Sequence, residues 1–410
     1  MKKTRDYAVI QVSPKGERQI RAGHPWVYYN DILQTEAGAE DGDIVDVVSE
    51  KGRYLGSGFY NHHSKIRVRL LSRNANDRFD NSFFERRLRY AWDYRKTVMG
   101  QEDVDACRLV FGESDQLPGL TVDRFHDLLV AQTLCLGIEK RKDVIFHTIV
   151  KLLEEEGATI RGLFERNDVA IRKLEGLEEG KGFYPILGKE NPGVPVTHIV
   201  ENGIVYEVDV ENGQKTGLFL DQKYNRRAAA HLAKGRTVLD CFTHTGSFAL
   251  NTAKQGAAHV HAVDVSEEAV KMAEHNAKLN HLENTMSFEQ ANVFDLLPQL
   301  AEEKKHVYDY IILDPPAFTK SRQTVENAMR GYKEINMRAM RLLPRGGYLA
   351  TCSCSHFMTE PLFCKMLQQA ADDAQVTLRQ IEARQQAPDH PILWNVPETN
   401  YLKFYLFQVV

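Results

Sequence analysis

The second half of the chain alternates short apolar runs with amphipathic stretches in a regular order. Runs of four to six residues rich in Val, Ile, Leu and Tyr predict buried strands, and these are expected at 237–242, 259–264, 285–289, 308–313 and 347–352. Stretches with helical spacing of apolar positions separate them, at 224–234, 246–255, 266–280, 293–303 and 324–343. A last strand is expected in 403–410. Strands separated by helices predict an α/β domain with a doubly wound, mostly parallel sheet.

The first half has a different pattern and predicts two further domains. Residues 43–48 are rich in β-branched residues, residues 65–70 alternate polar with apolar side chains, and few helical stretches occur before residue 73. We therefore expect a small β-barrel over 1–73. Helical spacing at 82–99 and 140–156, around strand-like runs near 120–133, predicts a central α+β domain over 74–190. A Pro/Gly-rich stretch follows, and the α/β domain, led by a β-hairpin, occupies 191–410.

Composition narrows the class of protein. The 410 residues are 43% hydrophobic, enough for packed cores, and no apolar run approaches the roughly 18 residues of a membrane span. The first residues lack the apolar core of a signal peptide. Six cysteines in so long a chain do not form a disulfide framework, so a reducing, cytoplasmic setting is expected.

Charge is unevenly distributed along the chain. The net charge is −4, but residues 1–100 carry 18 Lys and Arg against 13 Asp and Glu, whereas the remaining residues carry 34 against 43. A basic N-terminal part suggests an anionic partner. Alternation places Lys65, Arg67 and Arg69 on one strand face, where they could contact phosphates; an ordinary solvated strand face would show the same pattern.

The ends of the first predicted strands carry residues suited to a nucleoside. In doubly wound sheets, ligands bind beyond the carboxyl ends of the strands. Asp240 ends the first strand, and Gly246 follows where a helix begins and offers free N–H groups. Asp264 ends the second strand, at the distance expected of a carboxylate that binds ribose hydroxyls. Asn292 precedes the third helix, where it could contact an adenine or simply cap the helix.

The fourth and fifth strands end in residues that suit chemistry on a base. Asp314 is followed by Pro315 and Pro316, which fix the backbone and remove two N–H donors, as recognition of a flat base would require. Cys352 and Cys354 end the fifth strand. A thiolate can add to an electron-poor carbon such as C6 of a pyrimidine, which makes C5 able to accept a methyl group.

Other uses of the paired cysteines are less well supported. A metal centre usually needs four ligands, often in two spaced pairs, and the chain has one C-x-C with no second cluster. We therefore predict no metal. The spacing alone leaves a redox pair open.

Several motifs in the same order resemble one family. The chain resembles the RlmI-like family of S-adenosylmethionine-dependent 23S rRNA cytosine-C5 methyltransferases. The motifs that carry the resemblance run nearly end to end: Gly23–Tyr28, Asp115–Asp123, Glu165–Arg172, Gln214–Gly217, Leu220–Gln222, Asp240–Ser247, Asp314–Phe318, Gly331–Asn336 and Thr351–Ser355.

The resemblance implies a fold, a cofactor and site residues. It implies an N-terminal PUA domain, which binds RNA, and a Rossmann-like methyltransferase domain. The implied S-adenosylmethionine site comprises Lys215, Thr216, Asp221, Gln222, Asp240, Phe242, Thr243, Gly246, Asp264, Asn292 and Asp314. Pro315, Pro316 and Phe318 would hold the substrate base. Cys352 is the implied nucleophile, with Asp314 at the same catalytic site and Cys354 as the second choice. Asp389 is the implied proton-abstracting base.

The implied function is formation of 5-methylcytosine in 23S ribosomal RNA. A homodimer is left open. Two alternatives remain: a methyltransferase acting on an exocyclic amine, which usually carries an aromatic residue directly after Pro-Pro where this chain has Ala317, and a non-catalytic RNA-binding factor in ribosome assembly.

Overall fold

The computed structural model describes residues 5–302, 307–319 and 321–410. The chain forms two compact units, each built from three segments. The first unit contains the residues up to Ile199, then Glu207–Leu220 and Pro388–Thr399. The second contains Val200–Tyr206, Asp221–Ala387 and Asn400–Val410. The chain therefore passes from one unit to the other several times.

The N-terminal part of the first unit is a six-stranded sheet in the order β2-β6-β5-β4-β1-β3. Its elements are β1 (Val9–Val12), α1 (Pro14–Arg21), β2 (Trp26–Tyr28), β3 (Ile32–Thr35), β4 (Ile44–Ser49), β5 (Tyr54–Tyr60) and β6 (Ile66–Ser72). Apolar side chains of β1, β4 and β6 form its core. The sequence indicates few helices here, but α1 begins where the Ser13 side chain accepts a hydrogen bond from the Gly16 N–H.

The rest of the first unit surrounds a five-stranded sheet in the order β11-β10-β9-β8-β7. The elements are α2 (Asn81–Val98), β7 (Ala106–Phe111), β8 (Leu120–Phe125), β9 (Leu128–Thr133), α3 (Leu136–Glu139), α4 (Lys142–Glu155), β10 (Gly162–Arg166) and β11 (Lys181–Tyr184). Helices α2 and α4 pack together beside the sheet. A two-stranded hairpin follows, β12 (Val196–Glu201) and β13 (Ile204–Asp209); its turn residues Asn202 and Gly203 both have positive φ, as a type I′ turn requires.

The second unit is a seven-stranded sheet in the order β16-β15-β14-β17-β18-β20-β19. Its strands are β14 (Thr237–Cys241), β15 (His259–Asp264), β16 (Met286–Gln290), β17 (Tyr310–Leu313), β18 (Tyr348–Ser353), β19 (Leu378–Arg384) and β20 (Lys403–Val409). The first five in the sheet are parallel, and β20 runs antiparallel to β18. The predicted doubly wound, mostly parallel sheet is confirmed.

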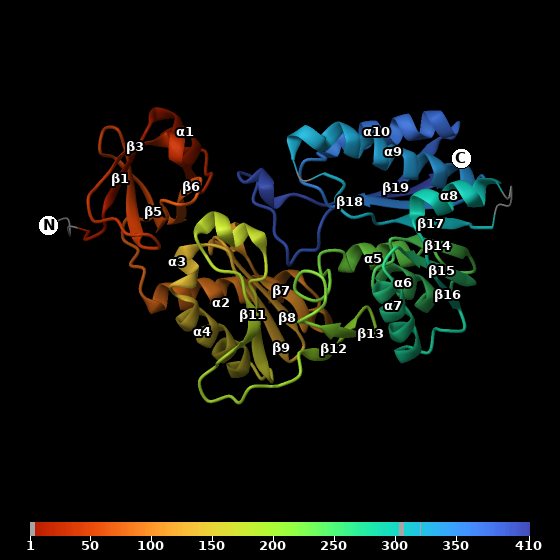
Figure 1. The fold of residues 1–410 in the computed structure, drawn as a ribbon, viewed down its shortest axis with the longest axis horizontal. Coiled ribbons are helices and arrows are strands. Elements are labelled where there is room, and N and C mark those ends of the chain that lie inside the picture. Colours follow the sequence, from red (N-terminus) through yellow and green to blue (C-terminus); the bar gives the residue numbers. More distant parts are fainter. Residues whose placement is uncertain (1–4, 303–306, 320) are drawn as a thin grey trace. The chain divides into compact units, whose positions relative to one another are not determined.

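Helices cover both faces of this sheet. They are α5 (Lys223–Ala230), α6 (Ser247–Lys254), α7 (Glu267–Leu279), α8 (Val293–Glu302), α9 (Val325–Leu342) and α10 (Glu360–Ala374). Figure 1 shows α8, α9 and α10 on one face and α5, α6 and α7 on the other. The strand order reverses between β14 and β17, so the crevice at their carboxyl ends is where this fold binds ligands.

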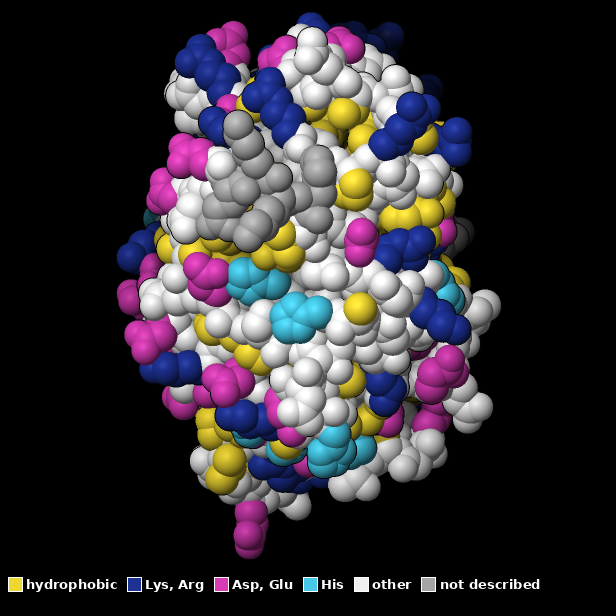
Figure 2. All heavy atoms as spheres, turned by 90° about the vertical axis from the view of Figure 1, so that its right-hand side faces the viewer, with side chains coloured by type: hydrophobic (Ala, Val, Ile, Leu, Met, Phe, Trp, Pro, Cys, Tyr) yellow, Lys and Arg dark blue, Asp and Glu magenta, His cyan; other side chains and the backbone are white. Residues whose placement is uncertain are grey.

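The surface of the described residues shows no large area of a single charge in the view of Figure 2. In the face shown in Figure 2, acidic and basic side chains are interspersed, with small apolar areas between them. Among the described residues, no helix combines the length and the apolar character needed to cross a lipid bilayer.

Gly246 offers a test of how the turn after β14 is built. Its φ is +82°, and a Cβ there would lie 3.0 Å from the Cβ of Ala273 on α7. Gly235 has φ +71° but open space around it. We expect Gly235→Ala to lower the free energy of unfolding by about 1 kcal/mol through backbone strain alone, and Gly246→Ala by about 2–3 kcal/mol. Urea unfolding measures both; equal losses would show that the approach of α7 does not constrain the turn.

Candidate active site

Five polar or thiol side chains lie at the carboxyl ends of five neighbouring parallel strands. Asp240 is near the end of β14, Asp264 ends β15, and Asn292 follows β16. Asp314 follows β17, and Cys352 is near the end of β18. The sheet therefore brings together at one edge the residues that the sequence places at successive strand ends.

Asp240 is a fully buried carboxylate with one oxygen unused. Its Oδ2 accepts hydrogen bonds from the Thr243 hydroxyl at 2.6 Å and from the Ala249 N–H at 3.0 Å. Its Oδ1 is buried and has no hydrogen-bond partner among the described residues. Burial raises the pKa of Asp240 to about 7. A donor group on a ligand would satisfy the free oxygen and favour the ionised form.

The loop after β14 has a strained backbone that Asp264 holds in place. Phe242 and His244 have φ values of 64° and 51°, in the left-handed region, and Gly246 is left-handed too. The Asp264 carboxylate accepts hydrogen bonds from the N–H groups of His244 at 2.9 Å and Ser266 at 3.0 Å. Asp264 therefore orders this loop, and its half-exposed side chain leaves remaining lone pairs for a hydroxyl ligand.

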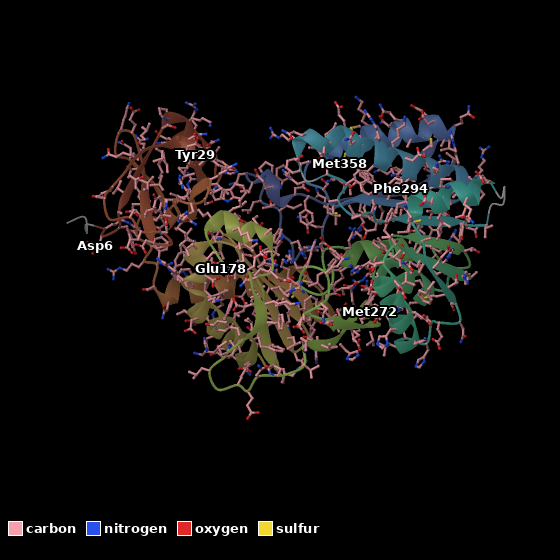
Figure 3. The ribbon with its side chains drawn as sticks, in the orientation of Figure 1. Asp6, Tyr29, Glu178, Met272, Phe294 and Met358 are labelled. Carbon is pink, nitrogen blue, oxygen red and sulfur yellow. The ribbon has the colours of Figure 1, made fainter. Side chains whose placement is uncertain are left out.

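Asn292 is exposed, and its hydrogen bonds are those of a residue that caps the start of helix α8. Its side chain accepts from the Phe294 N–H at 3.1 Å and donates to Asp295 at 2.9 Å. Two apolar side chains nearby were not singled out from the sequence. Val265, after β15, is 66% exposed, and Phe294, at the start of α8 (Figure 3), is 38% exposed. Apolar residues that stay exposed beside two polar strand ends suit the faces of a flat ring.

The Cys352 thiol is part of a buried hydrogen-bonded cluster. Its Sγ donates to Oδ1 of Asp314 at 2.8 Å and receives a hydrogen bond from the Gln222 amide at 3.3 Å. The same amide donates to Asp314 at 3.3 Å, and Asn225 donates to the Gln222 carbonyl at 2.6 Å. Burial, and then the neighbouring Asp314, raise the pKa of Cys352 well above its usual value. Burial also raises the pKa of Asp314.

The remaining predicted residues of this part of the sheet follow the ends of β17 and β18. Cys354 is half-buried, Pro315 is buried and Pro316 is exposed. The Phe318 ring lies 4.6 Å from that of Tyr332, whose hydroxyl accepts a hydrogen bond from Ser353 at 3.0 Å. Tyr332 lies in the Gly331–Asn336 motif, but the sequence gives it no role, because its contacts come from residues far from the helix α9 in the sequence.

Four residues that the resemblance implies for the cofactor site precede strand β14, and they are divided between the two units. Asp221 and Gln222 belong to the second unit, and the Tyr401 hydroxyl donates to Asp221 at 2.7 Å. Lys215 and Thr216 belong to the first unit. Thr216 is buried there and donates to Asp123 at 2.6 Å, while the Lys215 ammonium lies 4.4 Å from the centre of the Phe219 ring.

Asp389, which the resemblance implies as the proton-abstracting base, lies in a buried network of hydrogen bonds. It belongs to the first unit and is fully buried. Its carboxylate accepts hydrogen bonds from the Arg108 N–H and from His390, both at 2.9 Å, and its carbonyl accepts one from Arg95 at 2.8 Å. A carboxylate held in this way anchors its own segment, and its role as a base stays a prediction.

The basic strand face predicted on β6 is only partly available. Arg69 forms ion pairs with Glu175 at 2.9 Å and Glu113 at 3.4 Å, and its side chain is 13% exposed. It therefore ties the barrel to the central sheet, and its expected contact with phosphate stays a prediction. Lys65 is exposed, and the Arg67 guanidinium lies 5.9 Å from the centre of the exposed Tyr29 ring.

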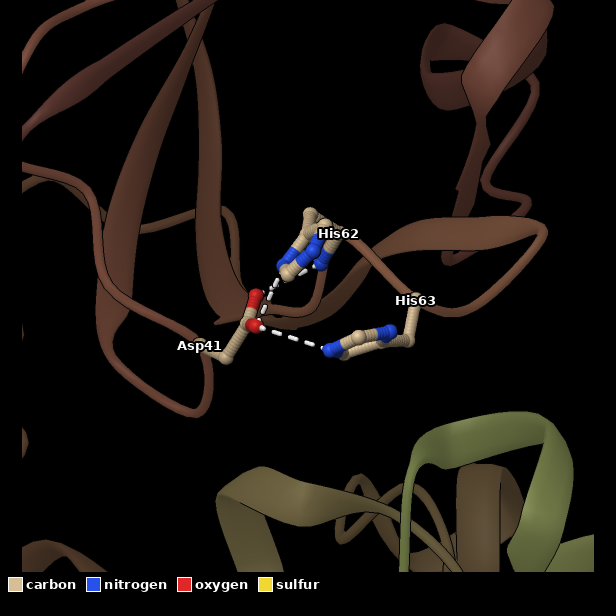
Figure 4. Close-up of side chains that lie close together, drawn as sticks. All are labelled: Asp41, His62 and His63. Carbon is tan, nitrogen blue, oxygen red and sulfur yellow. Dashed lines mark hydrogen bonds and ion pairs between the residues drawn. The ribbon is translucent and has the colours of Figure 1, made fainter.

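One cluster in the barrel has metal-ligating side chains, although the sequence predicts no metal. Asp41, His62 and His63 bring their ligand atoms within 4.8 Å of one another (Figure 4). Asp41 contacts both imidazoles, each of which is 57% exposed. Such a site would gain little from exclusion of water, and its three side chains form a polar cluster at the surface of the barrel.

Comparison with known families covers most of the chain. A PUA-like domain matches residues 10–73, and an S-adenosylmethionine-dependent methyltransferase matches residues 190–408. Two relatives named ribosomal RNA large subunit methyltransferase I come from Shewanella denitrificans and Klebsiella pneumoniae, with 42% and 37% identity over 96% of this chain. They are covered over 97% and 96% of their own lengths. The chain belongs to the S-adenosylmethionine-dependent methyltransferases.

Solved structures agree with this fold. A Streptococcus mutans protein assigned as an S-adenosylmethionine-dependent methyltransferase covers 98% of this methyltransferase with a TM-score of 0.79 at 21% identity, and is itself covered over its full length. A methyltransferase structure complexed with SAH gives a TM-score of 0.81 at 22% identity and the same coverage.

The residues of this methyltransferase fit its cofactor, S-adenosylmethionine. The unused oxygen of Asp240 can accept a hydrogen bond from the ammonium group of the methionine part. Asp264 offers lone pairs to ribose hydroxyls, and Val265 and Phe294 offer apolar surface to the adenine. These assignments follow the positions of the residues on the sheet edge and are tested through Asp240.

Asp240→Asn should separate cofactor binding from folding. The uncharged amide keeps an oxygen for Thr243 and Ala249 but loses the ionic contact, so we expect affinity for S-adenosylmethionine, measured by calorimetry, to fall about tenfold or more. Asp309→Asn is the control, because Asp309 caps the opposite edge of the sheet, where it accepts from the Thr237 N–H. Unchanged affinity in Asp240→Asn would contradict the assignment.

The stability of the same variant should depend on pH with a defined sign. Because the pKa of Asp240 is raised to about 7 in the folded protein, its stabilising contribution is complete below about pH 4 and is lost as the pH rises through 7. Asn cannot ionise. Thermal unfolding should therefore shift in favour of Asp240→Asn between about pH 5 and pH 8; parallel profiles would contradict the buried carboxylate.

Proposed function

We propose that this methyltransferase forms 5-methylcytosine in the 23S RNA of the large ribosomal subunit, with Cys352 as nucleophile. The observation that carries the proposal is the Cys352 thiol, 2.8 Å from Asp314 at the ligand-binding edge of the sheet. Relatives at 37–42% identity over nearly the whole chain are named ribosomal RNA large subunit methyltransferase I, which supports ribosomal RNA as the substrate.

The cluster around Cys352 can prepare the thiol for attack. Asp314 accepts the thiol hydrogen bond, and burial raises the Asp314 pKa, so this carboxylate can take up the thiol proton. The thiolate then forms an S–C6 bond with the cytosine, which makes C5 electron-rich. S-adenosylmethionine, when bound, supplies an electrophilic methyl group. Once C5 carries the methyl group, loss of its proton to a base lets the S–C6 bond break and returns the thiolate.

The substrate base must leave its stack to reach this site. Cys352 is 1% exposed, so only a single-stranded or flipped-out cytosine could approach it. Pro315 and Phe318 lie on the same edge and would contact the base ring. The PUA-like barrel would hold the surrounding RNA through phosphate contacts from Lys65 and Arg67.

The nucleophile can be tested by trapping. RNA that contains 5-fluorocytidine cannot lose a proton from C5, so the S–C6 adduct should persist and migrate as a protein–RNA band on denaturing gels. We expect Cys352→Ala to abolish both the adduct and methylation, because the variant lacks the sulfur that forms the proposed S–C6 bond. Cys354→Ala is the matched control and should retain the adduct. An adduct that persists in Cys352→Ala and disappears in Cys354→Ala would transfer the role to Cys354.

Mapping the product distinguishes this proposal from the other candidates. Mass spectrometry of ribosomal RNA methylated by the pure protein should place the methyl group on C5 of a cytosine. A methyl group on an exocyclic amine would overturn the C5 proposal, and absence of methylation despite cofactor binding would favour an assembly factor.

Substitution of the basic residues Lys65, Arg67 and Arg69 should affect either RNA binding or the stability of the fold. Lys65→Ala and Arg67→Ala should weaken RNA binding across sequences and reduce its salt dependence, because each would remove one phosphate contact. Arg69→Ala should instead lower the free energy of unfolding by about 2–3 kcal/mol, because the buried Glu175 carboxylate keeps its hydrogen bonds from Asn61 and Ser64 but loses the positive charge of Arg69. Filter binding at several salt concentrations and urea unfolding measure these effects. A salt dependence altered only by Arg69→Ala would reverse the assignment.

A further inference from the structure

A cavity of about 360 Å³ in the first unit has no part in the chemistry above. Its lining comes from the loop before β2, the end of β6, helix α2, the turn after β7 and the segment 388–399. Two of the motifs that carry the family resemblance, Gly23–Tyr28 and Asp115–Asp123, contribute to it. Ligand pockets begin at roughly 300 Å³, so this one can hold a small molecule or one nucleotide of a longer strand.

Two guanidinium groups at this cavity lack a carboxylate partner. Arg73 is exposed, and Arg87 of α2 is half-buried. Arg87 donates hydrogen bonds to the side-chain oxygen of Gln116 and, at 3.3 Å, to the carbonyl of Leu71, and both acceptors are neutral. Within the ranges that the structure describes, no carboxylate comes within ion-pair distance of either arginine. An anionic ligand would supply the missing charge, because a partly buried cation is costly without one.

The other charged groups of the cavity already have partners of opposite charge. The Glu113 carboxylate accepts a hydrogen bond from the Trp26 indole at 2.8 Å and pairs with Arg69 at 3.4 Å. The His24 imidazole lies 3.6 Å from a carboxylate oxygen of Glu398. The cavity therefore keeps an excess of positive charge, which favours a polyanion as its partner.

Trp394 lies beside this cavity with its ring almost wholly in solvent. The residue is 98% exposed, and its indole N–H has no hydrogen-bond partner in the described part of the chain. The two other tryptophans, Trp26 and Trp92, each donate to a glutamate at 2.8 Å. Trp394 is the second residue of a turn closed by a hydrogen bond of 2.9 Å from the Val396 N–H to the Leu393 carbonyl. Because the other three residues of that turn line the cavity, the indole lies at its rim.

The turn that carries Trp394 is held in place although the ring is uncovered. The Asn395 amide donates to the Gly23 carbonyl at 2.5 Å, and the Ser114 hydroxyl donates to the Pro391 carbonyl at 2.7 Å. A Cβ at Gly23 would lie 2.3 Å from the Asn395 amide nitrogen, so this close approach depends on glycine. An aromatic ring presented from a fixed backbone loses little conformational freedom on binding and can act as a platform on which a base stacks.

We propose that this cavity and the Trp394 ring form a site for single-stranded RNA, in which Arg73 and Arg87 bind phosphate groups and the indole stacks on an unpaired base. Basic groups beside an exposed aromatic ring suit a single strand, because each nucleotide offers a phosphate and a stacking face. The site belongs to the first unit, whereas Asp240 and Cys352 belong to the second. It rests on the proposed function only in taking RNA as the substrate.

Tryptophan fluorescence and affinity together test the role of the ring. The probe is a single-stranded RNA of about ten nucleotides, bound to the full chain and followed by fluorescence quenching and filter binding. Trp394→Ala should weaken binding about tenfold and remove most of the quenching. Trp394→Phe should also lose the quenching but keep most of the affinity, because phenylalanine still stacks. Leu187→Ala is the matched control, since Leu187 is 89% exposed in the same unit and does not line the cavity; it should change neither quantity.

The arginines are tested with the same RNA at several salt concentrations. Arg73→Gln and Arg87→Gln should each weaken binding and reduce its salt dependence by about one phosphate contact, and Arg73→Lys should retain most of that dependence. A strand of the same length without bases isolates the phosphate contribution. It should bind Trp394→Ala and the unaltered protein equally well, because it offers nothing on which the indole can stack.

The possible results separate this site from its alternatives. Equal affinity of Trp394→Ala and the unaltered protein for the RNA, with no quenching in the latter, would overturn the proposal. If Trp394→Ala binds RNA normally but loses a dimer in sedimentation, the ring serves a contact between two copies of the chain, and the proposal is wrong. If Arg87→Gln does not fold, Arg73→Gln and Trp394→Phe still decide. Weakened RNA binding by Trp394→Ala of a protein that forms no 5-methylcytosine would uphold the site and refute the proposed function alone.

Discussion

Burial of carboxylates at the carboxyl edge of the parallel sheet is the constraint on which the site depends. Asp240 and Asp314 lie on adjacent strands, β14 and β17, and burial raises the pKa of both. An ionised carboxylate in such a place is tolerated only with donors around it. The neighbouring groups follow from this need: the Thr243 hydroxyl for Asp240, and the Gln222 amide and Cys352 thiol for Asp314. One buried acceptor on this edge, Oδ1 of Asp240, has no hydrogen-bond donor among the described residues, and a ligand can supply one.

Much of this architecture could be predicted because its signals are local. The alternation of apolar runs with helical stretches predicted β14 to β18, and the topology of a parallel sheet then placed Asp240, Asp264, Asp314 and Cys352 at one edge. The turn between β12 and β13 could also be predicted from its Asn-Gly sequence, because a two-residue turn of this type needs residues that tolerate a positive φ.

What the sequence could not supply are partners brought together from distant positions. Gln222 meets Cys352 across 130 positions of the sequence, and the antiparallel pairing of β20 with β18 joins residues about 50 positions apart or more. The same limit explains Arg69 and Asp389. Each has the charge that its expected role requires, but partners from distant parts of the sequence bind its charged group. The guanidinium of Arg69 pairs with Glu175 and Glu113, and the carboxylate of Asp389 accepts hydrogen bonds from Arg108 and His390. Residue type predicts what a side chain can do, whereas its availability depends on the fold.

The interleaving of the two units has a consequence for how the protein can change. Residues 207–220 and 388–399 belong to the first unit, yet both fall inside the 190–408 span that matches the methyltransferase family. Cleavage between 199 and 200 would strip the first unit of two of its segments, including the one anchored by Asp389. The catalytic sheet therefore cannot be exchanged between proteins by a simple end-to-end fusion. In this lineage the central domain and the methyltransferase domain are expected to be inherited as one piece, and the barrel is tied to the same unit by the ion pairs of Arg69 with Glu113 and Glu175.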